Sequence, residues 1–216
     1  MKNNVIKEIV ENKIIVIVRG IERKYLIPLA EALYNGGIRL LEITYSANNS
    51  VSDEDTAANI KLLAEHFNGR MFIGAGTVLT EKQVELTANA GGKFIISPDT
   101  NAKVIAKTNE LNLVSIPGAL TPTEIQHAHT SGADFVKLFP ITNMGTAYVK
   151  AVKAPLSHIK LLAVGGVNKD NEGEFIKAGV CGIGTGGNLV NKEWIVNGEL
   201  DKITALAQEF VQNTNL

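Results

Sequence analysis

Hydrophobic positions along the chain form short runs rich in β-branched residues, and longer stretches with helical spacing separate these runs. The runs show little alternation of apolar and polar residues, which is typical of parallel strands buried on both faces. We expect strands at Ile14–Val18, Arg39–Thr44, Met71–Ala75, Phe94–Ser97, Leu113–Ile116, Phe135–Phe139, Ile159–Val164 and Val180–Gly184. Eight strands, each followed by a helix at about 27 residues per unit, predict an α/β protein with the (β/α)8 TIM barrel fold.

The segments between these runs carry helix start signals. Thr80 with Gln83, and Thr121 with Glu124, fit capping boxes, and Asn168 is expected to cap a later helix. The first residues, MKNNVIKEIVENK, predict a short amphipathic helix before the first strand. Because no linker or break in composition interrupts the pattern, we expect residues 1–216 to form a single domain.

A doubly wound open sheet also alternates strands and helices, and the segment from Gly182 to Gly187 contains G-x-G-x-x-G. A dinucleotide site requires a further strand after the following helix, with an acidic residue at its end. The remaining residues instead have a helical pattern, so the barrel is favoured.

Net charge, cysteine content and the length of the apolar runs exclude several classes of function. With 21 basic and 22 acidic residues, the net charge of -1 gives no basic surface for nucleic acid. Cys181 is the single cysteine, which excludes an internal disulfide and indicates a reducing, cytoplasmic compartment. No run resembles a signal peptide or a membrane span, so we expect no membrane association.

Two ionisable residues, Glu42 and Lys137, interrupt apolar strands. If they point into the barrel, burial lowers the pKa of the lysine and raises that of the acid. A neutral lysine can attack a carbonyl carbon to form a Schiff base, and a nearby acid can transfer the protons. The alternative is a buried ion pair that only fills the barrel, although such pairs contribute little net stability.

Other candidate residues follow the strands, at the end where barrels of this kind hold their active sites. Arg19 ends the first strand, Thr77 follows Gly74-Ala-Gly76, and Pro98 follows the fourth strand. Glycine-rich loops follow the last two strands, and their backbone N–H groups are suited to binding an anion such as phosphate. The alternative is that these glycines only form tight turns. The loop glycines are Gly165, Gly166, Gly184, Gly186 and Gly187.

The ordered segments VIVRG, LLEITYS, GAGTVLT, FIISPDT, SIPGALTPTE, FVKLFP and AVGGV resemble the 2-keto-3-deoxy-6-phosphogluconate (KDPG) and 4-hydroxy-2-oxoglutarate (KHG) aldolase family. The resemblance extends from Ile14 to about Val190. It implies a class I lyase without cofactor or metal, which cleaves a 2-keto acid to pyruvate and an aldehyde. It also implies a homotrimer.

The resemblance further implies residue roles. Lys137 matches the Schiff-base lysine, and Glu42 matches the residue that accepts and donates protons. The resemblance assigns the remaining matched residues to substrate binding, with Thr77 at the pyruvate carboxylate and Arg19 at an anionic end. Pro98 and Phe139 match the pocket walls, and Gly165, Gly166, Gly186 and Gly187 match the phosphate loops.

Three positions depart from the phosphogluconate-type pattern. Ser46 stands in place of an arginine, Val164 in place of a threonine, and Gly187 in place of a serine. Ser46 leaves carboxylate binding to fewer groups, and Gly187 leaves phosphate binding to fewer groups. The segment AVGGV, which contains Val164, resembles the branch of the family that cleaves the C4 epimer, the galactonate-derived acid. That epimer is therefore an alternative substrate. Remoter alternatives are a phosphate-binding barrel isomerase or epimerase, and a non-catalytic protein that binds a sugar acid.

Overall fold

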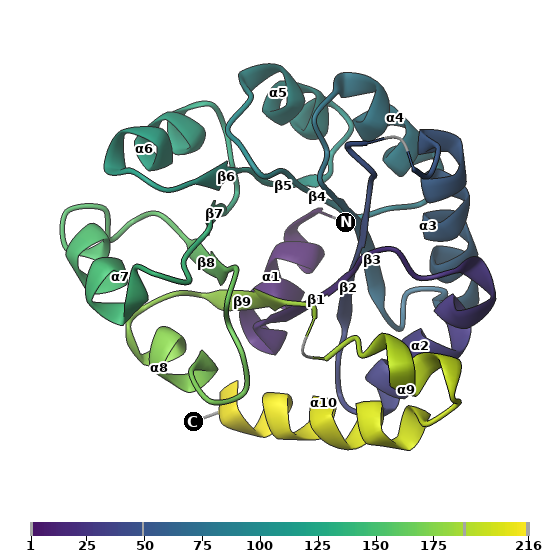
Figure 1. Cartoon of the computed structure of the whole chain (residues 1–216). Coiled ribbons are helices and arrows are strands. Elements are labelled where there is room, and N and C mark those ends of the chain that lie inside the picture. The colour runs from purple at the N-terminus through teal and green to yellow at the C-terminus, as the bar shows by residue number, and fades with distance from the viewer. Residues whose placement is uncertain (1, 49, 188, 215–216) are drawn as a thin grey trace.

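The strands of the computed structural model form one parallel sheet that curls into a barrel, and the structure describes residues 2–48, 50–187 and 189–214. Helices surround this ring of strands (Figure 1). The strands are β1 (Ile14–Val18), β2 (Leu40–Thr44), β3 (Phe72–Gly76), β4 (Phe94–Ile96), β5 (Val114–Ile116), β6 (Gly118–Ala119), β7 (Val136–Leu138), β8 (Leu161–Val164) and β9 (Gly182–Thr185). The helices are α1 (Lys2–Asn12), α2 (Arg23–Asn35), α3 (Asp53–Phe67), α4 (Glu81–Asn89), α5 (Ala102–Glu110), α6 (Pro122–Thr130), α7 (Gly145–Lys153), α8 (Glu172–Lys177), α9 (Lys192–Val196) and α10 (Leu200–Thr214).

The predicted (β/α)8 barrel is confirmed, with one strand divided in two. The sheet order is β5-β4-β3-β2-β1-β9-β8-β7-β6. The fifth predicted strand, Leu113–Ile116, corresponds to β5, which pairs with β4. A further short strand beyond its predicted end, β6, pairs with β7. Pro117 lies between them, and it has no N–H group to donate to the sheet. The segment β5–β6 therefore joins the two ends of the sheet as a single barrel position.

Apolar side chains fill two separate layers. One cluster lies between the strands and the outer helices. The other lies inside the ring, where Val5 and Ile9 of α1 pack against strand residues such as Phe94 and Phe135. Helix α1 therefore closes one end of the barrel, as its position within the ring in Figure 1 also shows. The Lys2 ammonium, 2.9 Å from the Asp134 carboxylate, secures the start of this helix.

Local capping agrees with the sequence at two of three positions. Both capping boxes form, with the Thr80 and Thr121 hydroxyls accepting backbone N–H groups. The expectation for Asn168 was wrong. Asn171 occupies the N-cap position of α8, and its side chain makes no cap hydrogen bond, because it binds the loop after β8 instead.

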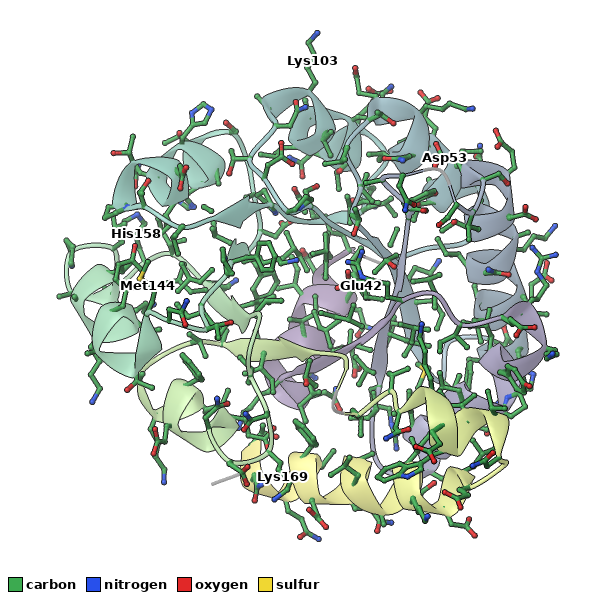
Figure 2. The ribbon with its side chains drawn as sticks, in the orientation of Figure 1. Glu42, Asp53, Lys103, Met144, His158 and Lys169 are labelled. Carbon is green, nitrogen blue, oxygen red and sulfur yellow. The ribbon has the colours of Figure 1, made fainter. Side chains whose placement is uncertain are left out.

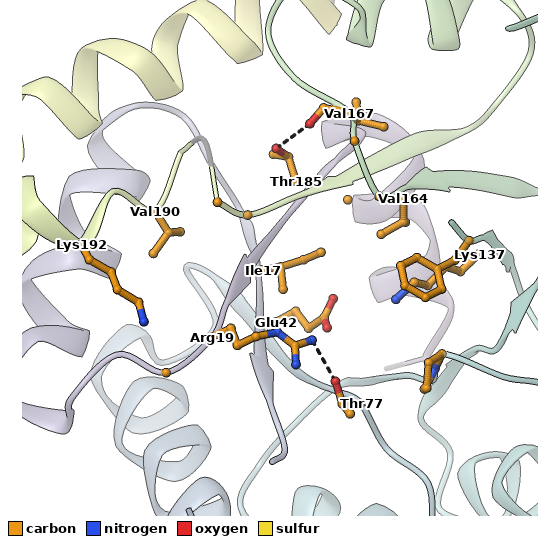
Figure 3. A pocket seen from close by; sticks show the side chains of 18 residues that line it. Ile17, Arg19, Glu42, Thr77, Lys137, Val164, Val167, Thr185, Val190 and Lys192 are labelled. Atoms are coloured by element: carbon orange, nitrogen blue, oxygen red, sulfur yellow. Dashed lines mark hydrogen bonds between the residues drawn. The ribbon is translucent and has the colours of Figure 1, made fainter. Parts of the chain in front are cut away.

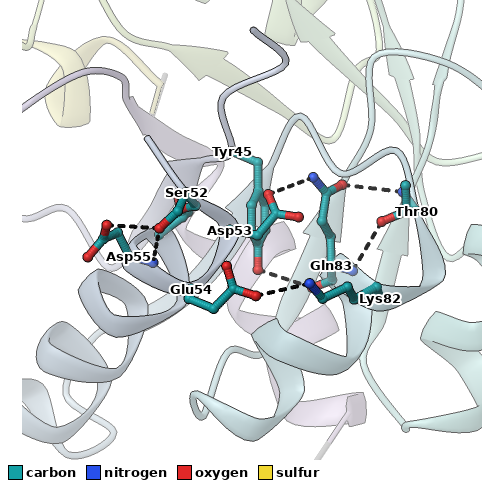
Figure 4. A network of polar contacts seen from close by, with 9 residues as sticks. Tyr45, Ser52, Asp53, Glu54, Asp55, Thr80, Lys82 and Gln83 are labelled. Atoms are coloured by element: carbon teal, nitrogen blue, oxygen red, sulfur yellow. Dashed lines mark hydrogen bonds and ion pairs between the residues drawn. The ribbon is translucent and has the colours of Figure 1, made fainter. Parts of the chain in front are cut away.

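A polar network between α3 and α4 holds the segment that follows β2 in place (Figure 4). The buried Tyr45 hydroxyl donates to the Gln83 carbonyl over 3.1 Å and contacts the Thr87 hydroxyl over 2.9 Å. The Gln83 side chain donates to the Asp53 carboxylate, linking α4 to the start of α3. Burial raises the pKa of Tyr45 to about 12, so its hydroxyl stays protonated and donates throughout the neutral range.

Candidate active site

A single pocket at the carboxyl ends of the strands collects the predicted site residues. It has a volume of about 520 Å³. All ten residues predicted from sequence line it, and they come from β2, β7 and the segments that follow the strands. They are Arg19, Glu42, Thr77, Pro98, Lys137, Phe139, Gly165, Gly166, Gly186 and Gly187. The structure thus brings together residues that are more than 160 positions apart in the chain (Figure 3).

Lys137 lies on β7 with only 7% of its surface exposed. Its backbone pairs in parallel with Gly118 of β6 and Leu162 of β8, and Leu162 belongs to the cluster inside the ring, so the Lys137 side chain, which lines the pocket, also points inward. The ammonium nitrogen is 4.5 Å from the centroid of the Phe139 ring. Burial lowers the pKa of Lys137, and the positive charge of Arg19 lowers it further, whereas Glu42 opposes the shift. The site therefore favours the neutral, nucleophilic amine.

Glu42 lies on β2 and is 2% exposed. Its carboxyl group lies over the backbone of β3, since a Cβ atom on Gly76 would come within 1.6 Å of Oε1. Burial raises the pKa of Glu42, and the charges of Lys137 and Arg19 oppose the rise. A carboxyl group with a raised pKa can both give and accept a proton near neutral pH.

Arg19 and Thr77 form a polar edge of the pocket, where an Arg19 nitrogen donates to the Thr77 hydroxyl over 3.1 Å. Thr77 has a positive φ of 56°, which is unusual for a β-branched residue. Such strained conformations cluster at functional sites, and here the turn directs the Thr77 side chain toward Arg19. A guanidinium group beside a hydroxyl is suited to bind a carboxylate.

The loop after β8 presents backbone N–H groups. Gly165 and Gly166 both have positive φ, at 90° and 83°. The Thr142 hydroxyl donates to the Gly165 carbonyl over 2.8 Å, and the Asn171 amide donates to the Gly166 carbonyl over 3.1 Å. Because N–H and C=O point in opposite directions in a trans peptide, the N–H groups of Gly166 and Val167 face away from these two side chains. Such paired amides can bind an anion.

Several pocket residues were not predicted. Thr185 is buried and donates to the Val167 carbonyl over 3.1 Å, which ties the loop after β8 to β9. Lys192, the first residue of α9, contributes a second ammonium group to the pocket lining. The only sequence signal for Lys192 is a basic residue soon after the glycines of the last strand. The apolar members of this set are Ile17, Val164, Val167 and Val190.

Within the described residues, no group of three or more His, Cys, Asp or Glu side chains is arranged to hold a metal ion. The expectation of a metal-free and cofactor-free reaction stays a prediction. The described part of the chain also contains no helix that is long and apolar enough to cross a membrane.

Comparisons with known proteins agree with this geometry. The family model described as KDPG and KHG aldolase matches residues 5–206. The 2-dehydro-3-deoxy-phosphogluconate aldolase of Treponema pallidum (strain Nichols) is 34% identical over 190 residues, which cover 86% of each chain. The 2-dehydro-3-deoxy-6-phosphogalactonate aldolase of Escherichia coli (strain K12) is 34% identical over 177 residues, covering 82% of this chain and 83% of its own.

A solved structure is similar over almost the whole chain. It is the KDPG aldolase of Legionella pneumophila, in which pyruvate is captured as a covalent carbinolamine intermediate. The TM-score is 0.81 at 28% identity, with 96% of this chain and 97% of that chain covered.

Proposed function

The chain belongs to the KDPG and KHG aldolase family, and from this premise we propose that it is a class I aldolase, a lyase that works through a Schiff base. Its substrate is a 2-keto-3-deoxy-6-phospho sugar acid of the gluconate series or 4-hydroxy-2-oxoglutarate. The products are pyruvate and an aldehyde, either glyceraldehyde 3-phosphate or glyoxylate. One observation carries the proposal, namely that Lys137 and Glu42 are both buried and line the same pocket.

The reaction begins at Lys137. The neutral amine adds to the C2 carbonyl carbon of the substrate, and the carbinolamine then loses water to give an iminium ion. Glu42 donates the proton that leaves with the hydroxyl group as water. The lowered pKa of Lys137 and the raised pKa of Glu42 both support this assignment, because the amine loses its proton at lower pH than usual and the acid holds its proton at higher pH than usual.

Cleavage then uses the same carboxyl group as a base. Glu42, now a carboxylate, removes the proton of the C4 hydroxyl, the C3–C4 bond breaks, and its electrons move into the iminium to form an enamine. The aldehyde leaves at this point. Protonation of the enamine at C3 regenerates an iminium ion, and water releases pyruvate and the free Lys137 amine.

The remaining pocket residues orient the substrate. Arg19 and Thr77 bind the carboxylate next to C2, and Pro98 and Phe139 wall the pocket. The loop glycines bind the distal phosphate through backbone N–H groups. Holding the reacting carbon near the amine, with charges already in place, supplies much of the rate enhancement in enzymes of this kind.

The galactonate series is a second candidate, because Val164 lines the pocket and the Escherichia coli relative described above is a 2-dehydro-3-deoxy-6-phosphogalactonate aldolase. The two series differ only in configuration at C4, so the same residues can catalyse either cleavage.

We also propose that the protein acts as a homotrimer in the cytoplasm. The family resemblance supports the trimer, and the lone Cys181 suits a reducing compartment.

The test is pyruvate release from a panel of substrates, compared by kcat/KM. The panel holds the phosphorylated gluconate and galactonate acids and 4-hydroxy-2-oxoglutarate, assayed with the natural protein and with Lys137→Met. We expect release from at least one substrate and none above background from the variant. Pyruvate release that survives Lys137→Met contradicts the proposal, because it would require C3–C4 cleavage without a Schiff base on Lys137.

A further inference from the structure

Lys192 supplies a cation that the aldolase chemistry described above does not use. It begins α9, directly after the loop that follows β9. The side chain of Asn191 accepts the Trp194 N–H over 3.1 Å, which fixes the start of this helix. In Figure 3 the Lys192 side chain extends from α9 into the pocket. Its ammonium nitrogen lies 3.5 Å from the position that a Cβ atom would occupy on Gly20.

No carboxylate among the described residues forms an ion pair with Lys192 within 4.0 Å, although twelve other ion pairs are present in that part of the chain. The Lys192 side chain is exposed at the mouth of the pocket. Its charge is therefore available to a ligand without first breaking a protein contact.

The charges of the pocket are unbalanced. Its ionisable lining residues are Arg19, Lys137 and Lys192 on the basic side, and Glu42 on the acidic side. Arg19 is turned toward Thr77, and the Lys192 ammonium lies on the far side of Arg19 from Thr77 (Figure 3). Two cations at separate places suit a ligand with two separate anionic groups.

The neighbouring loop has room for such a group. A Cβ atom on Gly187 would meet nothing within 4 Å, so open space adjoins the backbone there. Gly186 and Gly187 offer backbone N–H groups but no side chain to an anion. Lys192 is the basic residue that lines the pocket on this side, and its charge can add to these backbone N–H groups in binding a phosphate.

We propose that Lys192 binds the terminal phosphate of the substrate and makes the enzyme selective for phosphorylated over unphosphorylated 2-keto acids. The proposal rests on the aldolase function proposed above and adds a residue that determines specificity. Lys192 touches the distal phosphate only, and the bonds that break lie at C3–C4. Its loss should therefore weaken substrate binding far more than turnover.

The test compares Lys192→Met with the natural protein on two substrates of the same C4 configuration, one with and one without the terminal phosphate. A charge-assisted hydrogen bond to phosphate predicts a loss of about 10- to 100-fold in kcat/KM on the phosphorylated substrate, mainly through KM. On the unphosphorylated substrate the change should stay within about twofold. Lys192→Arg keeps the charge and should retain most of the preference for phosphate.

Two controls isolate the effect. Lys103→Met removes the same charge from the outer rim of the molecule, where Figure 2 shows Lys103 pointing away from the barrel. This variant should leave kcat/KM unchanged on both substrates. Inorganic phosphate should inhibit the natural protein competitively and inhibit Lys192→Met more weakly. Added salt should reduce the preference of the natural protein, because exposed charges are screened.

Equal losses on both substrates, or no loss on either, would overturn the proposal. A natural protein that shows no preference for the phosphorylated acid would overturn it as well. Such results leave the aldolase function standing as long as pyruvate still forms a reducible adduct on Lys137, which does not depend on Lys192. If no reducible adduct forms on Lys137, the result would instead contradict the proposed aldolase function itself.

Discussion

The Lys137 amine and the Glu42 carboxyl group are buried in one pocket, and burial shifts their pKa values toward each other. Both shifts favour the uncharged forms, which are the forms that start Schiff-base chemistry. Arg19 is the third ionisable residue that acts on this pair. Its positive charge lowers the pKa of Lys137 and also lowers the pKa of Glu42.

Replacing Arg19 with glutamine should shift the pH dependence of Schiff-base formation. Removing the positive charge lets the pKa of Lys137 rise, so the neutral amine forms only at higher pH. The pKa of Glu42 rises as well, so its carboxylate also forms at higher pH. The acidic limb of a pH profile of pyruvate trapping should therefore move to higher pH in Arg19→Gln. An unchanged or lower midpoint would contradict the electrostatic role of Arg19, and Lys103→Met serves as the control for loss of charge alone.

Gly76 allows the Glu42 carboxyl group to lie over β3, and Gly76→Ala tests that position. The new methyl group would come within 2.7 Å of Oε1, Cδ and Cγ of Glu42, all of them side-chain atoms, so the Glu42 side chain should move while the fold persists. Moving the Glu42 carboxyl group away from the reacting atoms predicts a loss of about 10- to 100-fold in kcat. Adding Gly76→Ala to Glu42→Gln should cost little more than Glu42→Gln alone. Fully additive losses would show that Gly76 acts by another route.

Sequence reasoning found residues whose chemistry conflicts with their surroundings. Lys137 and Glu42 stood out because a charge in an apolar strand needs an explanation. Lys192 did not stand out, because a lysine at the start of a short helix is ordinary. Its importance depends on the path of the chain after β9, which brings it to the pocket.

At the scale of elements, the strand pattern predicted each barrel position, and the division of the fifth was missed. A proline directly after a short strand suggests an end, whereas the chain continues beyond Pro117 as β6. The two capping boxes were predictable because each depends on two residues of one turn. The position of Asn171 was not, since its side chain bonds to the loop after β8 and not to the first turn of its own helix.

The junction of α8 and α10 carries a titratable group outside the pocket. Glu172 is fully buried, one of its oxygens accepts from the Asn213 amide over 3.1 Å, and the other has no partner among the described residues. Burial raises the pKa of Glu172 from its ordinary value of 4.5 to about 7. Between these pH values the folded protein binds the proton more tightly than the unfolded chain, so Glu172 lowers stability as pH rises.

Glu172→Gln removes this titration and should therefore change the pH dependence of stability. The free energy of unfolding of the variant minus that of the natural protein should increase by roughly 3 kcal/mol from pH 4 to pH 8. Urea denaturation at several pH values measures this difference. A constant difference across that range would mean that the Glu172 carboxyl group does not titrate between these limits in the folded protein.

At the scale of the whole molecule, the even spacing of eight strands was enough to predict the barrel, and the barrel was enough to predict which strand ends carry the site. Parallel pairing then brings Arg19, Glu42, Thr77 and Lys137 to one rim. The volume of the pocket and the direction of each side chain depend on packing among distant segments. Those features could not be read from the sequence.

We predict that residues 1–216 fold as one domain and assemble in threes. A single domain should unfold in one cooperative calorimetric transition, and light scattering should give the mass of three chains. Two separated transitions would contradict the single domain. A monomer at assay concentration that retains full activity would show that each pocket is complete without a partner and that the trimer is dispensable.

The most direct measurement is reduction with borohydride in the presence of pyruvate, followed by peptide mass analysis. Burial lowers the pKa of the Lys137 amine, which favours its condensation with the ketone of pyruvate, and reduction makes the new bond permanent. The result we predict is a secondary amine on Lys137 alone, absent without pyruvate and absent in Lys137→Met. Recovery of unmodified Lys137 after full treatment, from protein that is active on its substrate, would contradict the account.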